Sequence, residues 1–256
     1  MYYNVVSPSL YGPIIINRHD QVVGYNVSML GACMRQELEV LRQLCAWAHA
    51  QQKPVVFVDV GANIGMHSLA VASLRLPRLE CVAIEAQRAF FYQVCGTLAL
   101  NGLSHVQALH RVVSDKSGGY LNIPHIDLQS SANFGAFSLA QLEQTGFNGK
   151  FSGGSEAVES VALDDVVLVR DTNTAVVLKI DIEGMEPQAL AGAKNLLQRA
   201  QPALLVEYAI SGREAVLAAL HAAFGPEPLP YRAFELPDQN MLLLPKWCDG
   251  LEIKTS

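Results

Sequence analysis

The chain has 256 residues, of which 50% are hydrophobic and 16% are charged. This composition excludes an intrinsically disordered or fibrous protein, and a chain of this length can bury a core without disulfide bonds. Its 18 basic and 24 acidic residues give a net charge of -6 without any run of Lys or Arg, which disfavours a nucleic acid as partner. The longest apolar runs fall far short of the roughly 20 residues that a membrane-spanning helix needs, so we expect no membrane partner.

The five cysteines form no close-spaced pair, so neither a disulfide framework nor a zinc ribbon is predicted. The N-terminus has no basic start and carries scattered polar residues and prolines, unlike a secretory signal. These two observations predict a cytoplasmic protein. No feature of the sequence points to a particular oligomeric state.

The N-terminal region, residues 1–52, is predicted to form a hairpin and a helix that pack on the main fold. Two short extended pieces, Pro13–Ile16 and Gln21–Val27, flank a polar turn at Asn17–Asp20. A helix that ends before Gln51 follows, because apolar residues recur at spacings of four, three, four and three. These residues are Met34, Leu38, Leu41, Cys45 and Ala48.

After Pro54, strands and helices alternate along the chain. The first strand, Val55–Val58, is continuously apolar and mostly β-branched, as is typical of a strand buried on both faces. Further strands are expected at 81–85, 106–113, 175–182 and 203–208, and helices at 66–74, 89–100, 187–199 and 213–224. Two closing strands, 231–235 and 241–244, flank a turn at 237–239 and are expected to be antiparallel. The alternation predicts an α/β protein with a doubly wound parallel sheet.

The least regular region lies between the third and fourth core strands, at about residues 116–158. It is rich in turn formers, including Gly118, Gly119 and the stretch Gly146–Gly154, and part of it is expected to pair as strands. We assign residues 53–256 to one domain that contains this insertion. An insertion at this point lies above the carboxyl edge of the sheet, where ligands bind, so it is predicted to face the substrate.

A glycine-bearing turn, Asp59–Gly65, stands where the first buried strand gives way to a helix. Its two glycines, Gly61 and Gly65, let the backbone come close to a ligand. The third glycine of the dinucleotide pattern G-x-G-x-x-G is missing, so a nucleoside without a pyrophosphate fits better. Asp59 can accept a hydrogen bond from a ligand ammonium or through water, and Glu85, which ends the second strand, can accept both hydroxyls of a ribose. The alternatives are a plain tight turn and a solvated strand end.

Three segments together resemble the FkbM family of S-adenosylmethionine-dependent methyltransferases. They are Val58–Gly65, Lys179–Glu186 and Val206–Tyr208, and the similarity runs from about Gly31 to the C-terminus. The resemblance implies a class I methyltransferase (Rossmann-like) fold with seven strands, the last of them antiparallel. It also implies S-adenosyl-L-methionine as cofactor and, in most members, transfer of a methyl group to an oxygen atom.

The same resemblance assigns cofactor contacts residue by residue. The expected contacts are Asp59, Gly61, Asn63, Gly65, Ser68, Glu85, Ser114 and Asp115. The first four would hold the methionine end, and Ser68 lies near the start of the helix. Glu85 would hold the ribose, and the last two would lie beside the adenine. His67 stands where many relatives have an aromatic residue and is given no role.

Three charged residues, Lys179, Asp181 and Glu183, alternate with isoleucines at the end of the fourth core strand. An extended strand puts all three on one side, and helices cover both faces of a central strand. An unpaired buried ion costs several kcal/mol, so these residues are expected to be paired or functional. Glu207, which ends the adjacent strand, can complete the group. The alternative is a structural ion pair between Lys179 and Asp181.

We expect these four residues to be catalytic, because methylation of a hydroxyl requires alignment of the nucleophile and removal of a proton. Asp181 or Glu183 is predicted to act as base or orienting acceptor, while Lys179 tunes the carboxylate or binds the substrate. The three carboxylates suit magnesium, but the sequence requires no metal. Glu186 and Pro187 are expected to have a structural role at a helix start.

The sequence therefore predicts an S-adenosylmethionine-dependent methyltransferase that acts on a hydroxyl of a small molecule, sugar or glycan. Methylation of nucleic acids is disfavoured, because enzymes that modify exocyclic base nitrogens typically have an Asn/Asp-Pro-Pro-aromatic motif after the fourth strand, where this chain has Asp181–Gly184. Two alternatives stay open: a nicotinamide-dependent oxidoreductase on the same architecture, and a non-catalytic nucleoside-binding relative. We expect the insertion and the N-terminal segment to select the acceptor.

Overall fold

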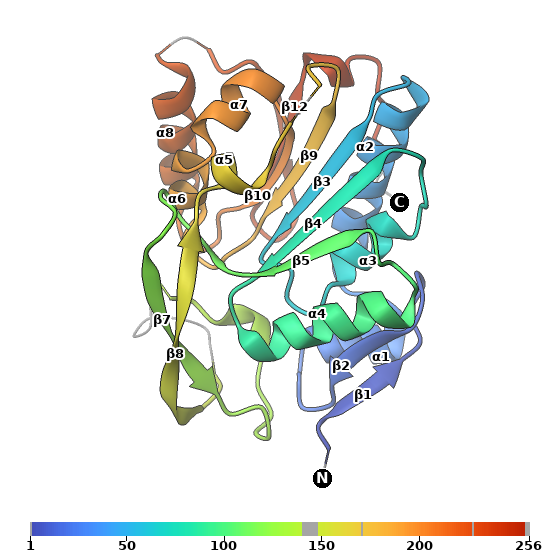
Figure 1. The fold of residues 1–256 in the computed structure, drawn as a ribbon, viewed down its shortest axis with the longest axis vertical. Coiled ribbons are helices and arrows are strands. Elements are labelled where there is room, and N and C mark those ends of the chain that lie inside the picture. The colour runs from blue at the N-terminus through green and yellow to red at the C-terminus, as the bar shows by residue number, and fades with distance from the viewer. Residues whose placement is uncertain (1, 140–147, 170, 227, 254–256) are drawn as a thin grey trace.

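The central sheet of the computed structural model has seven strands in the order β11-β12-β10-β9-β3-β4-β5 (Figure 1). The structure describes residues 2–139, 148–169, 171–226 and 228–253. The strands are β3 Val55–Val60, β4 Leu79–Glu85, β5 Val106–His110, β9 Ala175–Ile180, β10 Ala203–Glu207, β11 Tyr231–Leu236 and β12 Asn240–Pro245. Neighbouring strands are parallel, except that β12 is antiparallel to both β10 and β11. The α/β class I methyltransferase (Rossmann-like) fold with an antiparallel last strand is therefore confirmed.

Helices cover both faces of this sheet (Figure 1). One face carries α2 (Arg35–Ala50), α3 (Met66–Ala72) and α4 (Arg88–Leu100), and the other carries α6 (Glu186–Ala191), α7 (Lys194–Ala200) and α8 (Arg213–Phe224). Because side chains alternate along a strand, Phe57 of β3 enters the first core and its neighbour Val58 enters the second. By the same alternation Asp59 and Lys179 face the α2 side. None of the helices in the described part of the chain is both long and apolar enough to cross a membrane.

The N-terminal hairpin differs from the predicted one. Its elements are β1 Asn4–Ser7 and β2 Ile14–Asn17, which pair antiparallel, and helix α1 Val23–Leu30 follows. The predicted strand Gln21–Val27 is therefore wrong. Asp20 explains the difference, because its Oδ1 accepts hydrogen bonds from the backbone N–H groups of Val22 and Val23 at 3.0 and 3.1 Å and so starts a helix. Gly31, with a φ of 75°, ends that helix in the left-handed conformation.

Two predicted elements of the core are divided in the structure. The predicted strand 106–113 forms β5 and a separate β6, Val112–Val113, which pairs with β8 outside the central sheet. The predicted helix 187–199 forms α6 and α7, because the carboxylate of Asp164 accepts two backbone N–H groups near the start of α7 at 2.9 and 2.8 Å. The other core strands and helices lie where the sequence predicts them, with ends shifted by a few residues.

The insertion forms a β7–β8 hairpin beside the sheet, so the expected strand pairing within it is confirmed (Figure 1). Residues 146 and 147 of the glycine-rich stretch Gly146–Gly154 lie outside the described residues. The remaining elements are β7 Tyr120–Ile126, η1 Phe134–Ala136, β8 Phe151–Val161, α5 Leu163–Val166 and η2 Lys246–Cys248.

Candidate functional site

A cavity of about 540 Å3 opens at the carboxyl ends of β3, β4, β9 and β10. Small-molecule sites typically have volumes of roughly 300–1,000 Å3, so a cofactor and part of an acceptor can fit. The insertion and the N-terminal region complete the wall with residues that include Ile123, Phe134, Phe137, Val23, Asn26 and Met34. Both regions that the sequence associates with acceptor choice thus border the cavity.

The glycine turn after β3 brings the backbone to the cavity. Gly61 has a φ of 78°, and a Cβ at this position would lie 1.9 Å from the carbonyl oxygen of Asp181. Only glycine fits such a close approach. The Gly61 N–H donates to the carbonyl oxygen of Ile84 at 3.0 Å, which fixes the turn against β4. Gly61 and Asn63 line the cavity, whereas Gly65 is the N-cap of α3 and does not.

Asp59 and Ser68 lie behind this turn. The Oδ2 atom of Asp59 accepts hydrogen bonds from the backbone N–H and the hydroxyl of Ser68 at 3.0 and 2.7 Å. Both side chains are fully buried, and neither lines the cavity. They therefore hold the start of α3 from behind the turn.

Glu85 lines the cavity at the end of β4. Its Oε2 accepts a hydrogen bond from the backbone N–H of Asn63 at 2.8 Å, and its Oε1 accepts one from that of Gln87 at 2.7 Å. Burial raises the pKa of Glu85 to about 7, although these two N–H groups and Lys179 oppose the rise. The carboxylate is thus oriented by the loops after β3 and β4, and each oxygen keeps a lone pair for a ligand hydroxyl.

Two buried polar atoms beside Glu85 have no hydrogen-bond partner in the described part of the chain. They are Oδ1 of Asn63 and Nε2 of Gln87, and both residues line the cavity. Buried polar groups are normally hydrogen-bonded, so this part of the cavity is suited to a polar ligand. Gln87 lies two residues after the predicted ribose acid, but no sequence pattern distinguishes it.

Ser114 and Asp115 do not line the cavity. The Ser114 N–H donates to the carbonyl oxygen of Val161 at 2.9 Å, because the chain here continues the pairing of β6 with β8. The cavity is bordered instead by the preceding residues, Arg111–Val113. The chain thus brings Arg111–Val113 to the cavity, and not the two residues that the resemblance implies.

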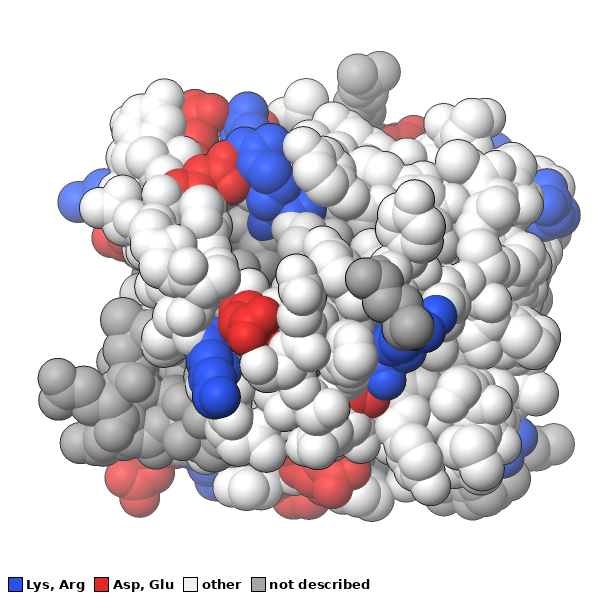
Figure 2. Space-filling model, turned by 90° about the horizontal axis from the view of Figure 1, so that it is seen from below, with Lys and Arg blue, Asp and Glu red and all other residues white. Residues whose placement is uncertain are grey.

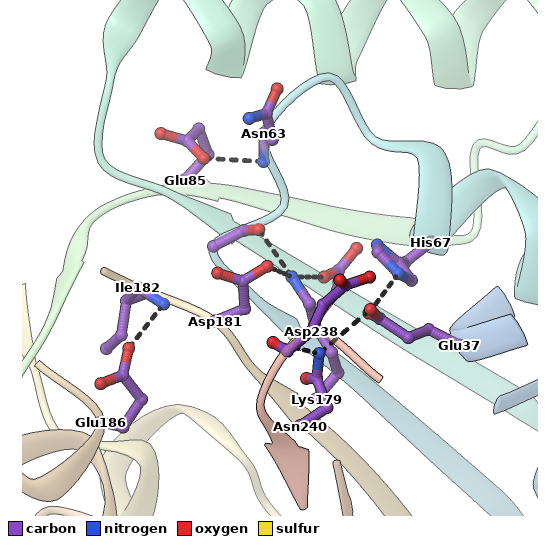
Figure 3. Close-up of polar contacts among 12 residues, drawn as sticks. Glu37, Asn63, His67, Glu85, Lys179, Asp181, Ile182, Glu186, Asp238 and Asn240 are labelled. Atoms are coloured by element: carbon purple, nitrogen blue, oxygen red, sulfur yellow. Dashed lines mark hydrogen bonds and ion pairs between the residues drawn. The ribbon is translucent and has the colours of Figure 1, made fainter. Parts of the chain in front are cut away.

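Lys179 is the buried centre of the charged group (Figure 3). Its Nζ lies 3.2 Å from Asp181 Oδ2 and 3.6 Å from Asp59 Oδ1, and it donates a hydrogen bond to the carbonyl oxygen of Gly61 at 3.0 Å. Burial alone would lower the pKa of Lys179, but the carboxylates of Asp181, Asp59 and Glu37 raise it. The ammonium therefore stays charged and ties the glycine turn to the end of β9.

Asp181, Glu183 and Glu207 present carboxylate oxygens that lie within 4.8 Å of one another. Burial would raise the pKa of Asp181, but Lys179 next to it holds the pKa below its usual range. Burial and the charge of Asp181 raise the pKa of Glu183 to about 8 and also raise that of Glu207. Near neutral pH the cluster therefore holds protons that hydroxyl groups can exchange, and the same oxygens would suit a divalent cation.

The loop after β9 differs from the expected extended strand. The strand ends at Ile180, and Glu183 has a φ of 53°. The backbone N–H groups of Ile182 and Gly184 both donate to Glu186 Oε1 at 3.0 Å, which confirms the structural role expected for Glu186. The Glu183 carboxylate thus reaches the cavity from a tight loop and not from the pleat of a strand.

The family model described as Methyltransferase FkbM domain matches residues 59–222. The chain belongs to this FkbM family. The resemblance stated from the sequence is therefore confirmed. No curated protein matches the chain.

Three solved structures are similar to this FkbM chain. Methyltransferase FkbM from Methylobacillus flagellatus KT is 17% identical, with a TM-score of 0.48, over 73% of this chain and 43% of that protein. Monomeric WbdD is 12% identical, with a TM-score of 0.48, over 86% and 43%. The SAH-bound methyltransferase PaMTH1 from Podospora anserina is 10% identical, with a TM-score of 0.43, over 79% and 76%. The chain thus spans 43% of the length of the first two.

One group in the cavity of this FkbM domain is not predicted from the sequence. Glu37, His67 and Asn240 line the cavity, and all three are buried. A signal for Glu37 was present, because a charged residue stands on the apolar stripe of the predicted helix between Met34 and Leu38. Asn240 follows the predicted turn 237–239, but nothing local distinguishes it from an ordinary strand start.

Proposed function

We propose that this chain is an S-adenosylmethionine-dependent methyltransferase that transfers a methyl group to a hydroxyl of a small molecule, sugar or glycan. Membership of the FkbM family supports methyl transfer. The observation that carries the proposal is that the glycine turn, Glu85 and the Lys179–Asp181 pair border one cavity. A nucleoside and an acceptor hydroxyl can then meet at the carboxyl edge of the sheet.

The residues present fit this cofactor. Glu85 would hold the ribose, the backbone from Gly61 to Asn63 would hold the methionine end, and Arg111–Val113 would lie beside the adenine. The unpartnered Gln87 amide supplies a further donor. When bound, S-adenosylmethionine supplies a methyl group on a positively charged sulfur. The carboxylates of the cavity wall complement that positive charge.

The acid cluster, which consists of Asp181, Glu183 and Glu207, fits an acceptor hydroxyl. Asp181 is held ionised by Lys179 and can accept a hydrogen bond from the hydroxyl, which orients its oxygen. Glu183 and Glu207 can donate or accept hydrogen bonds to neighbouring hydroxyls because their pKa values are raised. A polyol or sugar offers several such hydroxyls at once.

Surface charge supports a small acceptor over a nucleic acid. On the face in Figure 2, Lys and Arg side chains form small separate groups beside Asp and Glu, and most of the face is uncharged. A nucleic acid would need a continuous basic surface. We also propose a cytoplasmic location, since the five cysteines are free.

The cofactor assignment is tested by calorimetry with S-adenosylhomocysteine and with NAD. We expect S-adenosylhomocysteine to bind and NAD not to bind. Glu85→Gln should weaken this binding by at least about tenfold, the loss expected when a hydrogen bond to a charged group is removed. Glu80→Gln is the matched control, because Glu80 is exposed at the other end of the same strand. Binding of NAD alone would replace the proposal with the oxidoreductase.

The acceptor class is tested with S-adenosylmethionine carrying a labelled methyl group and a panel of sugars, glycans and small polyols. We expect label in an ether product from at least one hydroxyl acceptor. If S-adenosylhomocysteine binds but no panel member is methylated, the chain is the non-catalytic nucleoside-binding relative.

A further inference from the structure

Three buried polar residues outside the acid cluster meet in the wall of the same cavity (Figure 3). They come from different elements: Glu37 from α2, His67 from α3 and Asn240 from the start of β12. Glu37 Oε2 lies 3.4 Å from His67 Nε2, and Glu37 Oε1 accepts a hydrogen bond from Asn240 Nδ2 at 3.2 Å. The exposed fractions are 7% for Glu37, 2% for His67 and 4% for Asn240. The group is therefore shielded from bulk water but borders the ligand space.

These contacts favour one position for the imidazole proton. A buried carboxylate requires hydrogen-bond donors, and Asn240 supplies the donor for one oxygen of Glu37. The second oxygen lies 3.4 Å from His67 Nε2, a buried atom that makes no hydrogen bond in the described part of the chain, and a proton on Nε2 would best satisfy both atoms. A neutral imidazole has one N–H, which leaves Nδ1 as an acceptor.

The acid cluster is poorly suited to remove a proton. Glu183 and Glu207 are largely protonated near neutral pH, because burial raises their pKa values. Asp181 is paired with Lys179 and has a lowered pKa, so it is a weak base. The imidazole of His67 lines the same cavity and is a further group whose ring nitrogen can accept a proton. The 3.4 Å separation of Glu37 Oε2 and His67 Nε2 is long for a hydrogen bond.

We propose that His67 is the general base of the methyl transfer and that Glu37, held by Asn240, positions and stabilises it. The inference rests on the proposed function. The acceptor O–H bond breaks and its proton goes to His67 Nδ1, while the oxygen forms a bond to the methyl carbon. The carbon–sulfur bond breaks and its electron pair stays on sulfur. The products are the methyl ether, S-adenosylhomocysteine and an imidazolium, whose Nε2–H is balanced by the Glu37 carboxylate.

The first test uses the unsubstituted protein and needs no acceptor. Labelling histidine with 15N allows NMR to report which imidazole nitrogen carries the proton, and the signal of His67 is assigned by its absence in His67→Gln. We expect Nε2 to be protonated and Nδ1 to be unprotonated. In Glu37→Gln the amide NH2 can face Nε2, so the Nδ1-protonated form should appear, whereas Glu39→Gln on the same helix should leave the spectrum unchanged.

The second test measures turnover with an acceptor identified from the panel above. His67→Gln should lower kcat by about 10²- to 10⁴-fold, the usual contribution of general base catalysis, with S-adenosylhomocysteine affinity within about threefold of the wild type. His105→Gln is the control, because His105 is exposed. Glu37→Gln should lower kcat by about tenfold with little change in KM, since it acts through His67.

Either of two results would overturn the inference. One is a wild-type protein in which Nδ1 of His67 is protonated and Nε2 is not. The other is a folded His67→Gln variant whose kcat stays within about threefold of the wild type. A wild-type protein that neither binds S-adenosylhomocysteine nor methylates any acceptor would instead overturn the proposed function, whatever the imidazole spectrum.

Discussion

The two ends of the cavity are held in different ways. At the ribose end, backbone N–H groups of Asn63 and Gln87 orient Glu85, and the turn at Gly61 sets the distance between neighbouring loops. At the acid end, the charge of Lys179 holds Asp181 and the backbone of Gly61 in place. The first end depends on the path of the backbone and the second on a balance of buried charges. Substitutions should therefore affect stability and binding differently at the two ends.

The largest loss of stability is expected at the ribose end, which depends on the path of the backbone. Gly61→Ala places a Cβ 1.9 Å from the Asp181 carbonyl oxygen at a φ of 78°, so it should cost on the order of 5 kcal/mol or leave the protein unfolded. Thermal and urea unfolding measure this. Gly118→Ala is the control, because its φ of 84° is similar but nothing lies within 4 Å of the added Cβ. Equal losses for the two variants would show that φ alone, and not the close approach, requires glycine.

Removing the central charge tests the other end. Lys179→Met leaves Asp59 and Asp181 without their cation, and breaking such a buried pair costs about 3 kcal/mol or more. Denaturant unfolding measures the loss, with Lys53→Met as the control because the Lys53 contact is exposed. If Lys179→Met is as stable as the control, charge balance does not hold this end together.

The buried charges at the acid end should also make the stability of the protein depend on pH, with a smaller effect. Burial raises the pKa of Glu183 from 4.5 to about 8, so between these values the folded form binds more protons than the unfolded form. Stability from this group is therefore full below pH 4.5 and is lost as the pH rises through about 8. These two pKa values alone would give a loss of roughly 3–4 kcal/mol between pH 5 and pH 8. Because Glu183 is only partly buried, solvent screens its charge, so relative to Glu183→Gln the wild type should lose about 1–2 kcal/mol. If the difference in unfolding free energy between the wild type and Glu183→Gln stays constant from pH 5 to pH 8, the raised pKa of Glu183 is contradicted. Glu80→Gln is the control, because Glu80 is exposed.

The smallest effect separates binding from folding at the ribose end. Gln87→Leu removes a buried amide without a partner, so the free protein should be as stable as the wild type or slightly more stable. S-adenosylhomocysteine should bind about five- to tenfold more weakly, because the lost donor is worth about 1 kcal/mol. Calorimetry measures the affinity, with Gln107→Leu on the exposed side of β5 as the control. Unchanged affinity would leave the Gln87 amide without a ligand role.

The parts of the site that the sequence predicts are those that depend on a short stretch of chain. Val55–Val60, the glycine turn and Glu85 follow from local patterns of apolar residues and glycines, and the structure brings them to one edge. Errors arise where a single contact outweighs a pattern. Asp20 converts a β-like stretch into α1, and Asp164 divides a long predicted helix.

The site residues that escape prediction come from distant parts of the chain. Glu37, His67 and Asn240 meet only because α2, α3 and β12 converge on one cavity, and no local spacing relates them. Ser114 also shows the limit of carrying over a family pattern, because the β6–β8 pairing takes it away from the cavity. Tertiary convergence, more than secondary structure, determines this half of the site.

Because β12 runs antiparallel to its neighbours, a surface turn positions one of the polar residues of the cavity wall. A parallel strand would present its last residue at the reactive edge, but β12 presents its first, Asn240, directly after a turn in which Asp238 and Gln239 have φ values of 56° and 57°. The Asn240 amide also donates to the carbonyl oxygens of Pro237 and Asp238 at 3.4 Å. Small changes in this surface turn can therefore adjust the reach of Glu37 while the sheet interior stays as it is.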